Sequence, residues 1–221
     1  MTFRFSPTTL NLFFACRRCF WLHFNKEVRR PRGIFPSLPS GIDRVLKEYY
    51  NGYRKIKKLP PELEGKVEGS LFEDLALLEE WRNWRKGLSY QDKALDVTLT
   101  GAIDELLVNG DFYIPLDYKT KGSPPTQGDA ERYYRNQLDC YCFLLESNKR
   151  PTCSIGYLVF YSPDKAVKNG LVQFQVDLIK IETDPLRAKK TVADAVHFLK
   201  GPLPEPDGKC EYCEYTGNFE K

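Results

Sequence analysis

The sequence has little methionine, no long apolar segment and almost no excess of charge of either sign. No segment approaches the ~20 consecutive apolar residues that a membrane-spanning helix needs, so we expect no part embedded in a membrane. The single methionine among 221 residues excludes a methionine-rich, adaptable binding groove. The 33 basic and 30 acidic residues leave a formal net charge of +3, which permits nucleic-acid binding but does not by itself indicate it.

The residues that are present are typical of a folded protein. Hydrophobic residues make up 42% of the sequence and charged residues 29%, which excludes a disordered or collagen-like chain. A length of 221 residues favours one elaborated domain, residues 1–221, that needs no disulfides to hold its core. Asn11 interrupts the N-terminal apolar run and Cys16–Cys19 is a poor cleavage region, so we expect a cytoplasmic protein without a signal peptide. In that reducing compartment the seven cysteines are thiols or metal ligands.

Hydrophobic periodicity and turn residues predict an α/β architecture. Ser6-Pro7 fits the start of a first helix, and Ser40 with Asp43 forms a capping box at the start of a second. Helices are predicted at 7–24, 41–54, 72–86, 129–148 and 185–200, and strands at 95–100, 102–108, 112–118, 154–161 and 171–181. We therefore expect a mixed β-sheet lying between helices.

A predicted hairpin places charged residues on one face of this sheet. Asn109-Gly110 is a strong two-residue turn signal, and a turn there sets Asp104 opposite Pro115. Asp117 and Lys119 then lie on the same face as Asp104, because side chains alternate along a strand. Two carboxylates at such a separation can share a divalent cation; alternatively, the face is solvated and Lys119 forms an ordinary salt bridge with Asp117.

The helix that follows adds two polar residues. Gln137 and Tyr141 are four residues apart and therefore share a helix face. Either they take part in a site or they belong to an ordinary half-buried helix face.

Taken in order, Gly101-Ala-Ile-Asp104, Leu116-Asp-Tyr-Lys119 and Gln137-Leu-Asp-Cys-Tyr141 resemble the PD-(D/E)XK nuclease superfamily, in particular its RecB-like branch. The resemblance implies a restriction-endonuclease-like core at about 39–182, with a central mixed sheet flanked by helices. It also implies a DNA nuclease that uses Mg²⁺ or Mn²⁺. Asp104, Asp117 and the carbonyl of Tyr118 would hold the metal.

The resemblance implies roles for four further residues. Lys119 would hold the nucleophilic water and stabilise negative charge, while Gln137 and Tyr141 would orient the site or touch DNA. The family's upstream metal ligand on a helix corresponds by position to Asp43. The alternative for Asp43 is a structural role as the capping partner of Ser40.

Four cysteines form two close pairs at opposite ends of the chain. Cys16-x-x-Cys19 and Cys210-x-x-Cys213 have the spacing of a four-thiolate metal site, which would join the two ends. Zinc and a [4Fe–4S] cluster both accept four thiolates. The chain is similar to CRISPR-associated RecB-like exonucleases and AddB-type nuclease domains, which carry an iron–sulfur cluster, so [4Fe–4S] is favoured and zinc is the alternative. Their usual pattern of one cysteine before and three after the core differs from the two-and-two pattern here.

The function indicated is a metal-dependent DNA nuclease, exonucleolytic or acting on single strands. It would serve DNA repair, recombination or CRISPR adaptation, with a helicase or an adaptation complex as partner. The alternative is a non-catalytic nucleic-acid-binding or complex-forming module that retains the nuclease fold, with structural zinc. Basic residues that would contact DNA, or would form solvated faces, are Arg29, Arg30, Arg32 and Lys121, together with Lys55, Lys57 and Lys58.

Overall fold

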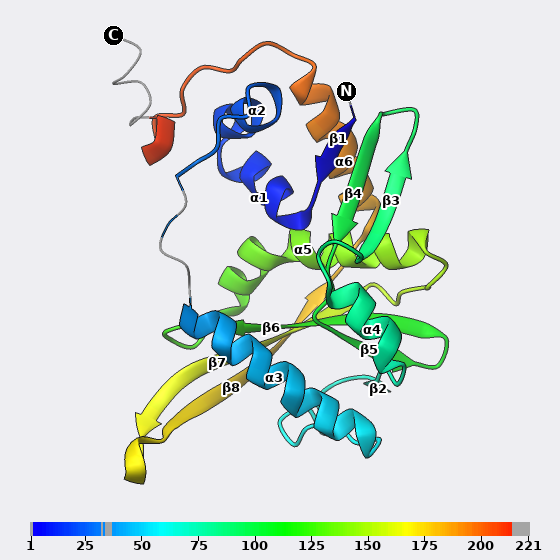
Figure 1. Ribbon diagram of the computed structural model, residues 1–221, viewed down its shortest axis with the longest axis vertical. Coiled ribbons are helices and arrows are strands. Elements are labelled where there is room, and N and C mark those ends of the chain that lie inside the picture. The colour runs from blue at the N-terminus through cyan, green and yellow to red at the C-terminus, as the bar shows by residue number, and fades with distance from the viewer. Residues whose placement is uncertain (1, 32, 34–36, 214–221) are drawn as a thin grey trace.

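The computed structural model describes residues 2–31, 33 and 37–213. Its centre is a five-stranded sheet in the order β2-β5-β6-β7-β8 (Figure 1). The strands are β2 (Ser70–Leu71), β5 (Glu105–Asn109), β6 (Phe112–Thr120), β7 (Ile155–Ala166) and β8 (Val172–Glu182). Strands β6 and β7 are parallel and the other neighbours are antiparallel, so the sheet is mixed, as predicted.

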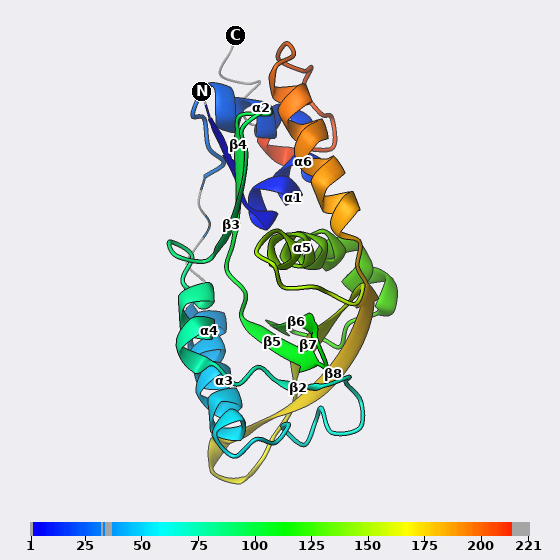
Figure 2. The same cartoon turned by 90° about the vertical axis from the view of Figure 1, so that its right-hand side faces the viewer.

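Two long helices cover the two faces of this sheet (Figure 2). Helix α3 (Ser37–Lys55) packs Leu46 and Tyr50 against a hydrophobic cluster that includes Tyr157 and Val159 of β7. Helix α5 (Gln127–Ser147) belongs to a second cluster, which contains the alternate β7 residues such as Leu158. The period of two along the strand therefore separates the two cores.

A smaller sheet and several helices lie beyond α5. Its order is β1-β4-β3, formed by β1 (Phe3–Phe5), β4 (Val97–Gly101) and β3 (Leu88–Asp92). Helices α1 (Pro7–Ala15), α2 (Arg17–Asn25) and α6 (Pro185–Leu199) lie there, whereas α4 (Leu75–Arg82) contacts β5 of the larger sheet. A 3₁₀ turn lies at Lys168–Gly170. Among the described helices, none combines the length and hydrophobicity needed to cross a bilayer. This arrangement has the mixed α/β, restriction-endonuclease-like character that the sequence predicts.

The two N-terminal helix predictions need correction. Residues 7–24 are not one helix, because Cys16 adopts an extended conformation (φ −163°, ψ 114°) that ends α1 and caps α2. Helix α3 begins at Ser37, so Ser40 and Asp43 lie inside it and the predicted capping box is wrong. Pro39 is tolerated there because a proline in the first turn removes no helical hydrogen bond.

The hairpin is also shifted from its predicted register. Asn109 pairs with Phe112, so the two loop residues are Gly110 and Asp111, and Gly110 takes the positive φ (58°). A type II′ turn places glycine first of the two central residues, which explains the shift. Residues 102–104 are not a strand, since β4 and β5 belong to different sheets. Because Glu105 pairs with Leu116, the preceding Asp104 lies next to Asp117 rather than opposite Pro115.

Candidate active site and cysteine cluster

Asp117 is the centre of the candidate site. Its carboxylate is fully buried between β6 and α5, and Oδ2 lies 2.5 Å from the Nζ of Lys119. The side-chain amide of Gln137 donates to Oδ1 at 3.0 Å and to the hydroxyl of Tyr141 at 2.7 Å. The structure thus brings together the predicted residues of β6 and α5.

The glycine of the Gly101-Ala-Ile-Asp104 motif lets α5 approach this site closely. A Cβ at residue 101 would lie 2.7 Å from Cδ1 of Leu144 and 3.4 Å from the ring of Tyr141. A larger residue at position 101 would therefore force the buried Leu144 side chain to move.

Asp104 and Asp43 converge on one ammonium group that the sequence analysis missed. The Nζ of Lys47 lies 3.1 Å from Asp104 Oδ1 and 2.8 Å from Asp43 Oδ2. Burial alone would lower the pKa of Lys47, but the two carboxylates outweigh it and raise the pKa. The four-residue spacing of Asp43 and Lys47 on one helix was the available signal. The Lys47 ammonium therefore lies between the two carboxylates, where a bound metal cation could take its place.

The backbone of Asp104 is held by residues that no motif singled out. Arg82 donates from Nε to the Asp104 carbonyl at 2.7 Å, and the Tyr118 hydroxyl donates to the same oxygen at 3.3 Å. Arg82 also pairs with the fully buried Glu105 at 3.1 Å, and Arg54 pairs with it from the other side. In the sequence, the one indication of this Glu105–Arg54–Arg82 cluster is that the apolar strand Glu105–Asn109 begins with a charged residue. Glu105, paired with both arginines, anchors the start of β5.

The electrostatics of Asp117 fit a bound divalent cation. Burial, opposed by Lys119 and reinforced by the neighbouring Asp104 carboxylate, raises the pKa of Asp117 to about 7. Its Oδ2 is buried and faces the Lys119 ammonium, yet within the described part of the chain it has no hydrogen bond of normal geometry. A cation shared by Asp104 and Asp117 would offset the repulsion between the two carboxylates and would give Asp117 Oδ2 a partner. The oxygen-rich donor set suits Mg²⁺ or Mn²⁺.

Raising the pH should destabilise the metal-free protein through Asp117. Its folded-state pKa of about 7 lies above the ~4 of an unfolded chain, so the folded state keeps the proton longer. Its stabilising contribution is complete below about pH 4 and is lost as the pH rises through 7. We expect the free energy of unfolding to fall by roughly a few kcal/mol over this range in urea titrations without added divalent cations. An equal fall in Asp117→Asn would contradict this assignment.

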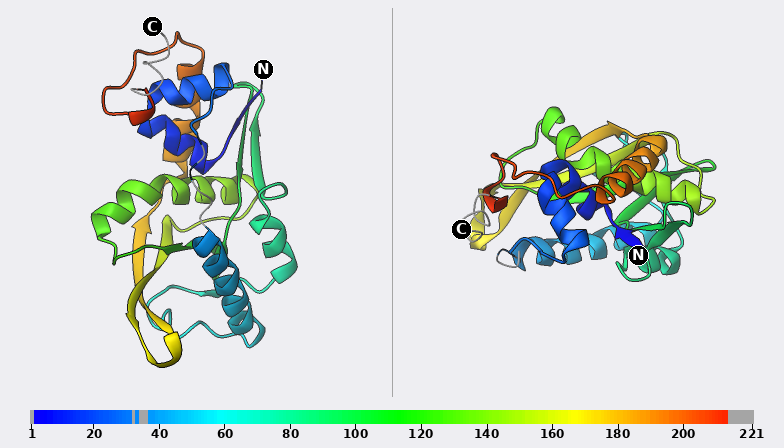
Figure 3. Two further views of the ribbon diagram at one scale, coloured as in Figure 1. Left: turned by 60° about the vertical axis from the view of Figure 1, so that its left-hand side comes forward. Right: turned by 90° about the horizontal axis from the view of Figure 1, so that it is seen from above.

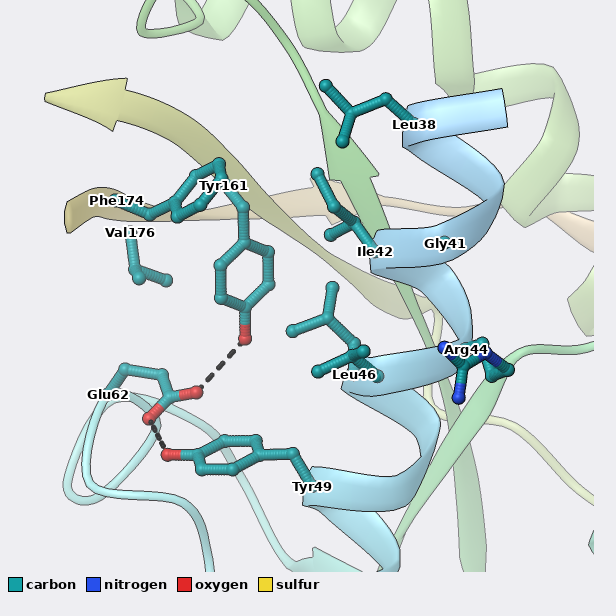
Figure 4. Close-up of a pocket in the computed structure, with 11 residues that line it drawn as sticks. Leu38, Gly41, Ile42, Arg44, Leu46, Tyr49, Glu62, Tyr161, Phe174 and Val176 are labelled. Carbon is teal, nitrogen blue, oxygen red and sulfur yellow. Dashed lines mark hydrogen bonds between the residues drawn. The ribbon is translucent and has the colours of Figure 1, made fainter. Parts of the chain in front are cut away.

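Two cavities flank α3, and they differ in chemistry. A cleft of about 320 Å³ is lined by Asp43, Tyr118 and Lys119, with Pro39, Ser40, Leu46 and Thr120. A cavity of about 620 Å³ between α3 and β7–β8 is largely apolar (Figure 4). Its one carboxylate, Glu62, accepts hydrogen bonds from Tyr49 and Tyr161, each at 3.0 Å. The smaller cleft therefore carries two charged groups of the candidate site, Asp43 and Lys119.

The predicted DNA-contacting residues are spread over the molecule. Arg29 is exposed, Lys121 lies 3.8 Å from Asp129, and Lys57 pairs with Glu73 at 3.0 Å. Arg30 lies instead at the cysteine cluster, where it donates to Cys210 Sγ at 3.3 Å. Arg32 lies outside the described residues.

The four terminal cysteines meet in space. Figure 3 shows the red turn that ends at residue 213 beside the blue helices α1 and α2. All four Sγ atoms lie within 4.8 Å of one another. Cys16 to Cys213, Cys19 to Cys210 and Cys19 to Cys213 are 3.4, 3.7 and 3.9 Å apart. The two chain ends are therefore joined at a cluster compatible with a metal site. Cys140 and Cys142 are buried elsewhere, and Cys153 is half-buried.

Comparison with known proteins agrees with this geometry. The family model of the PD-(D/E)XK nuclease superfamily matches residues 4–217. No curated protein matches the chain significantly. The match covers nearly all of the sequence, including both cysteine pairs and every residue of the candidate active site. The chain therefore belongs to the PD-(D/E)XK nuclease superfamily.

Proposed function

We propose that this protein is a Mg²⁺- or Mn²⁺-dependent deoxyribonuclease that hydrolyses phosphodiester bonds. The observation that carries the proposal is the convergence of Asp104 and Asp117 with Lys119, whose side chain lines an open cleft. A module that only binds nucleic acid has no use for a buried Asp117 carboxylate placed beside the half-buried Asp104 carboxylate.

Each residue has a role that its position supports. Asp104, Asp117 and the Tyr118 carbonyl would hold the metal, with Asp43 as a further ligand once Lys47 is displaced. The metal would supply an activated water and neutralise charge on the phosphate. Burial alone would lower the pKa of Lys119, but Asp117 and Asp104 raise it, so this side chain is an ammonium at neutral pH. It would therefore orient the water and stabilise the transition state rather than act as a base.

The remaining residues would position these groups and the substrate. Gln137 and Tyr141 would orient Asp117 through their hydrogen bonds. Lys121 and the exposed Arg29 would contact DNA phosphates.

We further propose that the protein belongs to the RecB-like branch and acts as an exonuclease or on single strands. Repair, recombination or CRISPR adaptation, with a helicase or an adaptation complex as partner, is the corresponding setting. The order of the Asp104, Asp117-Tyr-Lys119 and Gln137-Tyr141 motifs, which resembles that branch, supports this choice.

The proposal is tested with end-labelled single-stranded and double-stranded DNA incubated with Mn²⁺ or Mg²⁺. Progressive shortening from one end supports an exonuclease, and internal cuts contradict it. Tight DNA binding without cleavage under any of these metals would favour the non-catalytic module instead.

Asp43→Asn should raise the metal concentration needed for half-maximal DNA cleavage while leaving the fold intact. The substitution removes one anionic oxygen from the position that Lys47 now contacts, and cation affinity depends on ligand charge. Titration of Mn²⁺ against cleavage rate measures the effect. Glu48→Gln is the matched control, because Glu48 lies on the same helix and pairs with the exposed Arg44. An unchanged metal dependence would remove Asp43 from the proposed ligand set.

A further inference from the structure

The spacing of the four cysteine sulfurs distinguishes between metal groups. Four thiolates around a single Zn²⁺, each at about 2.3 Å in a tetrahedron, are separated from one another by about 3.8 Å. The observed separations of 3.4, 3.7 and 3.9 Å scatter around that value. All remaining pairs also lie within 4.8 Å. The site therefore has the dimensions of a single-ion centre.

The same spacing does not fit a [4Fe–4S] cluster. In such a cluster each cysteine binds a different iron, and bridging sulfides hold the irons apart. The four thiolates then lie on the outside of a polyatomic core, well beyond the separations seen here. All four cysteines are buried, at 1% to 8% exposure, and their sulfurs already lie as close together as the ligands of one ion. The iron–sulfur group that the family resemblance favours is therefore at odds with this site.

Both Cys-x-x-Cys segments are shaped to direct two sulfurs at one point. Cys16 caps α2, and its Sγ accepts the backbone N–H of Cys19 at 3.4 Å. In the second pair, the backbone N–H of Cys213 donates to the carbonyl of Cys210 at 3.0 Å, which closes the turn that brings the two sulfurs together. These bonds fix the sulfur positions within each pair, as structural zinc sites require.

Arg30 completes the surroundings of this cluster. Its Nη2 donates to Cys210 Sγ at 3.3 Å, and its guanidinium lies 4.5 Å from the ring centre of Tyr212. Four thiolates around a divalent ion carry two net negative charges, which are unfavourable in a buried site. A fixed guanidinium offsets part of this charge and holds one thiolate in place.

We propose that Cys16, Cys19, Cys210 and Cys213 bind one Zn²⁺ in tetrahedral geometry, with Arg30 as a positioning residue that supports the Cys210 thiolate. Zinc is preferred over a single ferrous ion because thiolate sites bind Zn²⁺ more tightly. This site is structural and independent of the proposed nuclease activity.

The composition of the bound metal tests the proposal. The full chain is expressed with both iron and zinc supplied, purified under anaerobic conditions, and analysed for metals and acid-labile sulfide. We expect one zinc per chain, no sulfide and no absorbance near ~400 nm of the kind that iron–sulfur clusters give. Exchange with Co²⁺ should give the visible bands of a tetrahedral thiolate site. Iron with equal sulfide, one iron without sulfide, or metal-free folded protein would each overturn the proposal.

The role of Arg30 is tested separately by chelator competition. Arg30→Gln should weaken zinc binding about 10- to 100-fold, as loss of an outer-shell contact to a ligand does. Arg30→Lys, which keeps the charge, should recover part of that loss. Arg29→Gln is the matched control, because Arg29 is the exposed neighbour. Equal zinc affinity in the Arg29 and Arg30 variants would exclude the positioning role, and thermal melts of the zinc-loaded proteins confirm that each variant is folded.

Discussion

Lys119→Ala and Asp117→Asn should each remove nearly all DNA cleavage by the purified protein in Mn²⁺ or Mg²⁺. For Lys119 the expected loss is on the order of 10²–10³ in rate, the usual effect of removing one electrostatic contact to a transition state. Asp117→Asn should lose at least as much, because an amide cannot replace an anionic metal ligand. Initial rates on end-labelled DNA at saturating metal measure both.

The stability of the same variants separates a catalytic role from a structural one. Asp117→Asn keeps an acceptor for Gln137 but removes a buried negative charge. At pH 8 and without divalent cations, this variant should therefore unfold at a higher urea concentration than the parent protein. Lys190→Ala, an exposed lysine of α6 that pairs with Asp194, is the control and should keep full activity. Full activity in both Asp117→Asn and Lys119→Ala would exclude this site.

Serine at Cys210 should release the metal of the cysteine cluster and destabilise the whole chain. The cluster ties α2 to residues 210–213, and an unfolded chain cannot present four ligands already assembled. Structural zinc in small domains contributes about 10–16 kcal/mol of binding free energy. Even a loss of ~4 kcal/mol would lower Tm by about 8–16 °C in a chain of this size.

Differential scanning calorimetry and metal analysis together measure this effect. Cys153→Ser is the matched control, since Cys153 is half-buried and lies outside the cluster; it should retain the metal and shift Tm far less. A Cys210→Ser variant with unchanged metal content and Tm would show that the terminal thiols hold no structural ion.

Local patterns in the sequence determined much of the fold. The helix predicted at 129–148 is α5 (Gln127–Ser147), and the strand predicted at 154–161 is the first part of β7 (Ile155–Ala166). Asp117, Lys119, Gln137 and Tyr141 could be grouped in advance because strand and helix periods decide which side chains share a face. These features depend on residues close together in the chain.

The hairpin and the N-terminal helix depended on local choices that periodicity does not resolve. A turn at Asn109-Gly110 and one at Gly110-Asp111 fit the same residues, and the structure takes the second, in which Gly110 is the first central residue and has the positive φ. The same apolar run reads as one helix or as two, and the extended backbone at Cys16 divides it. Both features are set by the backbone conformation of single residues, Gly110 and Cys16, which hydrophobic periodicity does not reveal.

Only the tertiary structure decided the contacts between distant segments. Lys47 pairs with Asp104, which is 57 positions away in the sequence, and Arg82 donates a hydrogen bond to the backbone carbonyl of that aspartate. Arg30, predicted to contact DNA, instead donates to Cys210, which is 180 positions away. The two cysteine pairs indicated a four-thiolate site from sequence, but the sulfur separations that favour one ion arise where the two chain ends meet. Residue spacing in the sequence indicates which side chains could form a site. The distances and the charge balance between side chains of distant segments depend on how the helices pack on the sheet.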